Sequence, residues 1–498
     1  MNDAVLASLY AIRPELLLTF YAFFMLLLAV FPALKRYLGG LAAFGCVLTL
    51  GVVFSYHYQQ GFAGLQGAHH LFFANLVVLD GFGLFFKVIF LSSALLSILI
   101  SMRYLDIEGI QSGEYYSLMF FAVVGMMFMA SAADLITVFV GLELMAVSVY
   151  ILVGYLRGNR KSNEAAMKYF LLGAFSTGIF VYGTSLVYGV TGSTNLYEIG
   201  LAVQAGGAPS GMLLLAMVLL TVALGFKVAA VPFHTWAPDA YEGAPTTITA
   251  FISTAAKAAA FVVFIRIYAV AFQGLRDQWT LLLAVLSVAS MTLGNITALL
   301  QDNMKRMLAY SSIAHAGYVL IGLIAMSRPD ADAQEWGLMS MIFYLLVYTF
   351  INIGAFSLVV MFRRENLVGD RVVDFSGLQQ RCPAAAFAML VFMLSLAGIP
   401  ATAGFIGKYY LFSAAMKAHF GWLAVVMVLN SVVSAFYYLR VVVMMYVKAP
   451  VDSVPYATSP GLVAATGLCL AFNLVVGLYP QPLLEFTRQS LMALSLPG

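Results

Sequence analysis

The chain has 498 residues, of which 62% are hydrophobic and only 9% are charged, and its formal net charge is +3. So few polar residues cannot cover a soluble globule of this length, which excludes a soluble protein. We expect the lipid bilayer as a partner and no nucleic acid.

Apolar runs of about 20 residues follow one another along the chain, and each is long enough to cross roughly 30 Å of hydrocarbon as a helix. We therefore predict an all-α integral membrane protein with about 14 transmembrane helices. In chain order the expected spans are 14–34, 40–58, 79–102, 115–131, 133–156, 164–190, 211–232, 246–270, 278–300, 304–326, 337–362, 384–417, 420–447 and 460–479.

The positive charges indicate how these helices are oriented. If successive loops alternate between the two sides, most Lys and Arg residues outside the spans gather on one side, among them Lys35, Arg160 and Arg306. The positive-inside rule makes this side cytoplasmic. We therefore expect a multi-pass protein with both termini on the non-cytoplasmic side.

The sequence contains no recognisable cofactor or metal motif. Cys46, Cys382 and Cys469 are far apart and lack the CxxC or CxxH spacing of iron–sulfur and zinc sites. No GxGxxG sequence follows a strand, and there is no phosphate-binding loop. We therefore expect this chain to bind no metal and no redox cofactor, so any redox chemistry takes place elsewhere.

A weak internal repeat is present. YILVGY at 150–155 is matched by YVLIGL at 318–323, and at the same offset of 168 residues Pro232 falls on Pro400. Repeats with paired broken helices mark the ion path of many transporters. Each copy would contain five spans, so we expect the second copy to be inverted relative to the first. Chance matches in an apolar sequence of low diversity are the alternative.

The expected organisation has four parts. Helices 1–3 occupy 1–110, a first repeat of helices 4–8 occupies 111–270, a second repeat of helices 9–13 occupies 271–450, and helix 14 lies in 451–498. We expect helices 7 and 12 to be broken. The run that contains helix 12 is too long for one straight crossing and is interrupted by GIPATAGFIGK.

Lysines inside the predicted spans are the main candidates for function. In LLTVALGFKVAAVPFHTWAPD at 219–239, Lys227 lies in the middle of an apolar helix, five residues before Pro232, which removes a backbone hydrogen bond. A lysine at the centre of a membrane helix costs roughly 2.5–3.5 kcal/mol, so packing alone would not select Lys227, Lys257 and Lys408. Burial lowers the pKa of a lysine and a nearby carboxylate raises it again, so a moving partner could load and unload the proton. We expect a hydrated proton site at mid-membrane.

Glu143 lies near the middle of the fifth span, without a charged neighbour within one helical turn. A carboxylate there must be protonated or pair with a cation from another helix, and the candidate partners are Lys168, Lys227 and Lys257. We expect Glu143 and its partner to take part in proton transfer. A static ion pair that fixes helix packing is the alternative. Lys168 starts one turn inside its span and could extend to the cytoplasmic surface.

Four further polar residues are weaker candidates for proton transfer. His315 could relay protons between waters or could simply form packing hydrogen bonds. His234, Asp239 and Glu242 follow the break on the expected cytoplasmic side, where they form a proton entrance or only a solvated loop. Lys87 has no obvious partner, and we expect a structural role for it.

Four motifs carry a family resemblance. They are GFKVAAVPFHTWAPDAYEGAPT at 225–246, STAAKAAAF at 253–261, NMKRMLAYSSIAHAGY at 303–318 and LAGIPATAGFIGKYYLF at 396–412. Together they resemble the antiporter-like subunits of the bacterial proton-pumping NADH:quinone oxidoreductase, respiratory complex I, and among these the subunit N family. The likeness extends over almost the entire chain. The lysine at position 408 favours subunit N over a sister subunit that carries glutamate there.

The resemblance implies 14 transmembrane helices in two inverted five-helix repeats, with broken helices 7 and 12. It assigns proton-transfer roles to the glutamate of the fifth helix and to lysines of the sixth, seventh, eighth and twelfth helices. These positions match Glu143, Lys168, Lys227, Lys257 and Lys408.

The function implied is that of a translocase subunit in a bacterial inner membrane, which pumps protons outward while quinone is reduced in another subunit. The resemblance implies that the whole complex uses NADH, FMN, iron–sulfur clusters and quinone, and that an antiporter-like subunit and small membrane subunits flank this chain. A subunit of a multisubunit Na⁺/H⁺ antiporter and a structural membrane scaffold are the alternatives.

Overall fold

The computed structural model describes residues 2–64, 70–110, 113–206, 210–363, 369–450 and 458–491. The helices of the first half are α1 (Asn2–Ala11), α2 (Arg13–Ala29), α3 (Leu38–Gly64), α4 (Gly81–Ile107), α5 (Gly113–Ala130), α6 (Leu135–Val153), α7 (Arg160–Thr191), α8 (Leu196–Ala205), α9 (Gly211–Val228), α10 (Trp236–Gly243) and α11 (Thr246–Phe251). Those of the second half are α12 (Lys257–Arg266), α13 (Arg276–Leu299), α14 (Met304–Ala325), α15 (Ala331–Met361), α16 (Leu378–Arg381), α17 (Pro383–Ala397), α18 (Ala403–Lys417), α19 (Gly421–Tyr446), α20 (Pro460–Leu478) and α21 (Gln481–Leu491). Strands β1 (His70–Phe72) and β2 (Val77–Leu79) form an antiparallel hairpin in which Leu71 pairs with Val78.

The prediction of a multi-pass, all-α membrane protein is confirmed. In the described ranges, twelve helices are long and apolar enough to cross a membrane, or thirteen if α1 and α2, which are bent by 71°, count as one span. The expected number was about 14. The difference arises at 384–417, where the structure has two helices, α17 and α18, of 15 residues each. Gly398, just after α17, has a φ of 86°, a left-handed conformation that glycine adopts without strain.

Helix α9 ends inside the seventh apolar run. Ala229 adopts a left-handed conformation (φ 59°), and its N–H bonds to carbonyls of the last helical turn. The next helix, α10, begins only at Trp236. Pro232 lies between the two helices, where its missing N–H interrupts no helical hydrogen bond. The chain therefore leaves the helical conformation after Val228, so Lys227 belongs to the last turn of α9.

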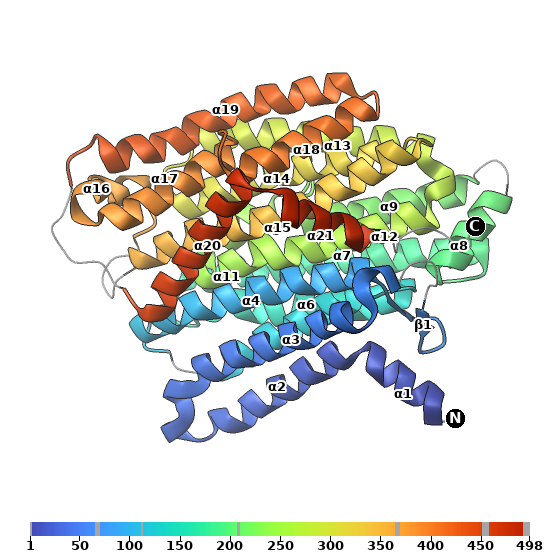
Figure 1. Cartoon of the computed structure of the whole chain (residues 1–498), viewed down its shortest axis with the longest axis horizontal. Helices are drawn as coiled ribbons and strands as arrows, with labels where there is room; N and C mark the ends of the chain where they lie inside the picture. The colour runs from blue at the N-terminus through green and yellow to red at the C-terminus, as the bar shows by residue number, and fades with distance from the viewer. Residues whose placement is uncertain are drawn as a thin grey trace.

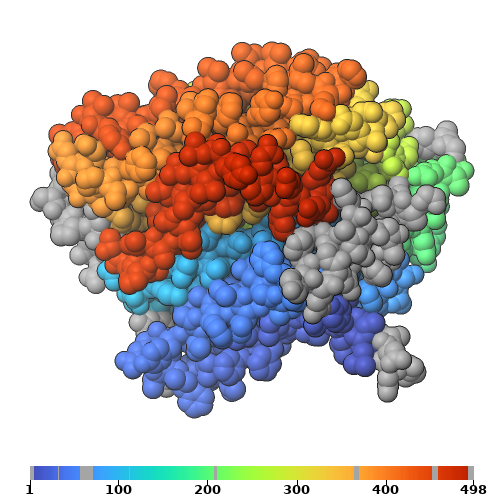
Figure 2. All heavy atoms as spheres, viewed as in Figure 1, coloured from blue at the N-terminus to red at the C-terminus, as the bar shows by residue number. Residues whose placement is uncertain are grey.

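The interior of the molecule is built from helices that carry predicted site residues. The segment Thr246–Ala271, which joins α11, α12 and two π-helical turns, is almost completely buried, as are α14 and α15. Helices α7, α19 and α20 instead expose many apolar side chains, as lipid-facing helices do. In Figure 1, α2 and α19 lie at opposite edges, with α12, α14 and α15 between them. Helices α20 and α21 lie across one face of this assembly (Figure 2).

Two buried ion pairs connect helices away from the predicted site. Lys87 of α4 lies 2.6 Å from Glu15 of α2, and both side chains are 1% exposed. Arg266 of α12 makes two hydrogen bonds of 2.9 and 3.0 Å to Asp80 and one of 2.7 Å to the carbonyl of Ala130. Lys87 therefore has a partner that the sequence did not reveal, and this partner supports the structural role expected for it.

Candidate functional site

Lys227 lies in the last turn of α9. Its side chain is 6% exposed, and its Nζ donates a hydrogen bond of 3.3 Å to the hydroxyl of Tyr150 on α6. The Tyr150 ring centroid is 5.8 Å from Nζ and that of Phe226 is 5.9 Å away, so two aromatic rings adjoin the ammonium group. The last carbonyls of α9 add the negative end of the helix dipole. Lys227 is thus buried among neutral groups.

Glu143 does not pair directly with a lysine, contrary to our expectation. Its Oε1 accepts a hydrogen bond of 2.7 Å from the hydroxyl of Thr177 on α7, and no ion pair within 4.0 Å joins it to a cation among the described residues. The physical reason is the position along the helix: Tyr150 lies seven residues, or two turns, beyond Glu143 on the same face of α6, and at the level of Lys227 this face carries the Tyr150 hydroxyl. Glu143 therefore makes no direct bond to Lys227, and its effect on this lysine is electrostatic.

Lys168 points to the surface. Its side chain is 45% exposed and makes ion pairs of 2.8 Å with Glu164 and with Asp239 of α10. This agrees with the expectation that Lys168 reaches the surface, and it excludes Lys168 as the direct partner of Glu143 in this structure.

Lys257 lies in the centre of the molecule. It is 4% exposed, and it follows a π-helical turn at Ile252–Ala256. Its Nζ donates hydrogen bonds of 2.6 Å to the carbonyl and 2.5 Å to the hydroxyl of Ser312 on α14. π-Helical turns are frequent at functional sites, because they rotate the following side chains relative to an α-helix.

His315, one helical turn beyond Ser312, continues the polar path on α14. Its Nε2 shares a hydrogen bond of 3.0 Å with the hydroxyl of Tyr438 on α19, and its Nδ1 is hydrogen-bonded to the hydroxyl of Tyr344 on α15. Tyr438 is in turn hydrogen-bonded to Ser311. A histidine between two hydroxyls can accept a proton on one side and release one on the other.

Lys408 of α18 lies beside Tyr318, which is one further turn along α14 from His315. It is 7% exposed, and its Nζ donates hydrogen bonds of 2.9 and 3.0 Å to the carbonyls of Leu396 and Ala397 at the end of α17. Its Nζ is 5.0 Å from the ring centroid of Tyr318. The absence of a side chain at Gly398 is required here, since a Cβ would lie 2.8 Å from Lys408 Cδ. Lys408, like Lys257, is surrounded by neutral partners.

A charged cluster lies at the surface beyond α10. Arg306 bridges Asp239 and Glu242 at 2.8 and 2.9 Å, and Lys161 adds an ion pair of 2.8 Å to Glu242. A cavity of about 220 Å³ lies within this cluster. Burial raises the pKa of the Asp239 and Glu242 carboxyls, but their ion pairs outweigh it, so both pKa values lie below their usual range. Both groups are therefore ionised at neutral pH.

The predicted loop residues are thus brought together only in part. Asp239 and Glu242 share Arg306, whereas no hydrogen bond or ion pair joins His234 to either acid in the part of the chain that the structure describes. Lys305, one residue before Arg306, is buried and donates to the carbonyls of Glu242 and Ala244.

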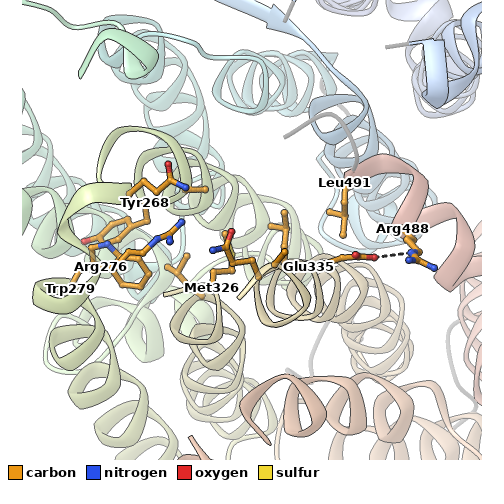
Figure 3. A pocket seen from close by; sticks show the side chains of 13 residues that line it. Tyr268, Arg276, Trp279, Met326, Glu335, Arg488 and Leu491 are labelled. Carbon is orange, nitrogen blue, oxygen red and sulfur yellow. Dashed lines mark hydrogen bonds and ion pairs between the residues drawn. The ribbon is translucent and has the colours of Figure 1, made fainter. Parts of the chain in front are cut away.

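A second pocket lies at the opposite end of α14. Its volume is about 290 Å³, and Figure 3 shows Tyr268, Arg276, Trp279 and Met326 around it. An ion pair of 2.7 Å between Glu335 and Arg488 crosses its other side (Figure 3). The predicted proton-transfer residues do not line this pocket.

Most of the site residues that could not be identified from the sequence carry a hydroxyl group. Tyr150, Tyr344 and Tyr438 contact the predicted lysine and histidine directly. Such residues are common in apolar helices, so their presence alone gave no signal. Only Tyr150 had one, because it opens the repeated YILVGY sequence.

No group of three or more His, Cys, Asp or Glu side chains that could hold a metal ion occurs within the described ranges. The buried amines, the imidazole and the hydroxyl groups described above are of the kinds that can donate and accept protons.

Comparisons with known proteins agree on one family. The family described as NADH:quinone oxidoreductase/Mrp antiporter, TM, matches residues 132–434. NADH-quinone oxidoreductase subunit N of Trichlorobacter lovleyi is 47% identical over 490 residues, which are 97% of each chain. A chain of respiratory complex I from Thermus thermophilus with bound aureothin is 32% identical with a TM-score of 0.77, over 95% of this chain and 98% of that one. A chain of the Mrp complex from Dietzia has a TM-score of 0.86 but only 22% identity, over 99% of this chain and 98% of that one, and shares the fold.

Proposed function

Because the chain belongs to the family of NADH-quinone oxidoreductase subunit N, we propose that its buried lysines carry protons across the membrane. The chain is a multi-pass membrane subunit of the proton-translocating NADH:quinone oxidoreductase, and its partners are other membrane-arm subunits of that complex. NADH, FMN, iron–sulfur clusters and quinone are used by other subunits.

One observation carries this proposal: Lys227, Lys257 and Lys408 are buried, yet all their hydrogen-bond partners among the described residues are neutral. A scaffold would hold its buried charges in ion pairs, as this chain does with Glu15 and Lys87. A buried lysine that makes no direct ion pair can lose and regain its proton without breaking one. The three lysines are therefore suited to exchange protons rather than to hold helices together.

The order of the groups suggests a cycle. The carboxylate of Glu143 attracts the ammonium group of Lys227, and a charge change that reaches Glu143 along the membrane weakens this attraction. Lys227 then passes its proton through water to Lys257, and Ser312 and His315 continue the path along α14 towards Lys408. Lys408 releases the proton to the non-cytoplasmic side, where we place both termini. In this cycle α9 with α10, and α17 with α18, are the two parts of broken membrane helices.

The charged cluster at Asp239 and Glu242 serves as the cytoplasmic entrance in this proposal. Lys168 and Arg306 hold both carboxylates at the surface cavity, and His234 lies between the cluster and Lys227 in the chain. Ionised carboxylates at a cavity can hydrogen-bond water, through which protons would enter from bulk solvent. The two inverted repeats, helices 4–8 and 9–13, would meet between Lys257 and His315.

A Na⁺/H⁺ antiporter subunit is the rival function, and the carried ion distinguishes the two. We expect NADH-driven proton uptake by inverted membrane vesicles to proceed at the same rate in Na⁺-free and Na⁺-containing medium, because the described hydrogen-bond partners of the three lysines are neutral groups and not the carboxylates that Na⁺ would need as ligands. A protonophore should abolish the pH gradient and a Na⁺ ionophore should not. Proton movement that requires Na⁺ would favour the antiporter.

A further inference from the structure

Two tyrosines occupy the same place relative to the internal repeat, and each contacts a lysine that adjoins a helix break. Tyr150 and Tyr318 begin the matching sequences YILVGY and YVLIGL, 168 residues apart. Tyr150 contacts Lys227 at the end of α9, and Tyr318 contacts Lys408, which bonds to the end of α17. The two contacts differ in their chemistry, and this difference assigns a role to Tyr150.

Tyr150 contacts Lys227 through its hydroxyl. Lys227 Nζ donates to this oxygen at 3.3 Å, and the described residues show no other side-chain hydrogen bond to Nζ. A phenolic hydroxyl both accepts and donates, so it can serve an ammonium group as acceptor and a neutral amine as donor. A carbonyl or a carboxylate could serve only the ammonium group.

Tyr318 contacts Lys408 through its ring face. The distance from Nζ to the ring centroid is 5.0 Å, while the Tyr318 hydroxyl accepts a hydrogen bond of 3.0 Å from Asn295. A ring face attracts a cation and offers nothing specific to a neutral amine. Tyr318 thus supports only the charged state of its lysine, and its hydroxyl is used elsewhere.

The surroundings of Tyr150 fix its hydroxyl in place. Its ring packs edge-on against Tyr169 at 4.8 Å, and Tyr169 stacks on Trp236 at 4.2 Å. The indole N–H of Trp236 donates to the carbonyl of Phe226, the residue before Lys227, at 2.8 Å. Tyr150 is thus connected through Tyr169 and Trp236 to the backbone carbonyl of Phe226, which precedes Lys227.

A glycine on the neighbouring helix makes room for the hydroxyl. A Cβ at Gly173 of α7 would lie 1.9 Å from the Tyr150 hydroxyl oxygen, which is far closer than any real contact. Gly173 lies within a regular helix, where alanine is the more favourable residue. The position of the Tyr150 hydroxyl therefore explains why glycine is needed at position 173.

We propose that Tyr150 is a positioning residue that stabilises both protonation states of Lys227, accepting a hydrogen bond from its ammonium group and donating one to its amine after the proton has left. The inference rests on the proposed function of Lys227. The proton passes from Nζ to water, and the phenol keeps its own proton and only rotates its O–H bond, so no charge forms on Tyr150. Lys227 can then discharge without leaving a buried amine unbonded, which would slow the step.

The test compares Tyr150→Phe with Tyr318→Phe in membranes that contain the assembled complex. Both changes remove one hydroxyl and keep the ring. We expect Tyr150→Phe to slow proton pumping and coupled NADH oxidation about tenfold. We also expect a larger solvent deuterium isotope effect, because proton loss from Lys227 becomes rate-limiting. Tyr318→Phe keeps the ring face against Lys408, so we expect a smaller rise in the isotope effect than in Tyr150→Phe.

Gly173→Ala is a second variant that leaves Tyr150 itself unchanged. The added methyl group must displace the hydroxyl, so we expect slower pumping and a larger isotope effect here too. Normal rates and isotope effects in both Tyr150→Phe and Gly173→Ala would overturn the inference. If Lys227→Ala stops pumping while these two variants are normal, only the role of Tyr150 fails. Normal pumping in Lys227→Ala would refute the proposed function itself.

Discussion

Replacement of Lys257 by methionine is expected to reduce proton pumping about 100-fold in membranes that contain normal amounts of the assembled complex. Methionine preserves most of the volume and removes the amine that bonds to Ser312, so the proton path between the two halves of the chain loses its central carrier. Coupled NADH:quinone turnover should fall as well, because it cannot run without proton movement. The measurement is vesicle acidification together with NADH oxidation, with assembly checked on a native gel.

The matched control is the double variant Glu15→Gln with Lys87→Met. It also removes a buried lysine, but one that is neutralised by an ion pair outside the proposed path. We expect this variant to pump at the wild-type rate wherever the complex assembles. Equal effects of the two lysine substitutions on assembled complexes would mean that buried lysines in this chain share a structural role, contrary to our account.

Replacement of Arg266 by methionine is expected to destabilise the folded subunit by about 3–5 kcal/mol. Arg266 makes the bidentate pair with Asp80 and bonds to the carbonyl of Ala130, so its loss leaves a buried carboxylate without a counter-ion. The pair joins α12 to the start of α4, and the loss should therefore appear as reduced assembly and a lower temperature of thermal dissociation. Pumping per assembled complex should remain close to wild type, because Arg266 lies outside the proposed path.

The double variant Asp80→Asn with Arg266→Met distinguishes an unpaired charge from lost packing. Because no buried charge then remains, much of the stability of the assembled complex should return. A double variant as unstable as Arg266→Met alone would show that the packing of the guanidinium group, rather than the unpaired carboxylate, accounts for the loss.

The sequence predicted the class of fold and the main candidate residues because both depend on local composition. Apolar runs of sufficient length specify membrane helices, and Lys227, Lys257 and Lys408 were recognisable because lysine is costly inside such runs. The ends of α9 and α17 lie near Pro232 and at Gly398, the residues that disfavour a continuous helix.

The partners of these residues could not be predicted, because they depend on how one helix is rotated and shifted along its axis against another. Glu143 was expected to bind a lysine directly, yet Tyr150, two turns further along the same face of α6, contacts Lys227, and Glu143 bonds to Thr177. Likewise, the pairing of Glu15 with Lys87 joins residues 72 positions apart in sequence, and no local pattern connects them. The roles assigned to the individual lysines stay predictions until they are tested by substitution.

The central claim is that Lys227 exchanges protons in the coupled path. Its most direct test is to record NADH oxidation and proton uptake simultaneously in inverted vesicles that carry Lys227→Ala, in amounts of assembled complex matched to wild type on a native gel. Our account predicts that proton uptake is lost and that quinone-coupled NADH oxidation falls with it. Normal assembly with wild-type proton uptake would contradict the account and would reduce Lys227 to a structural residue.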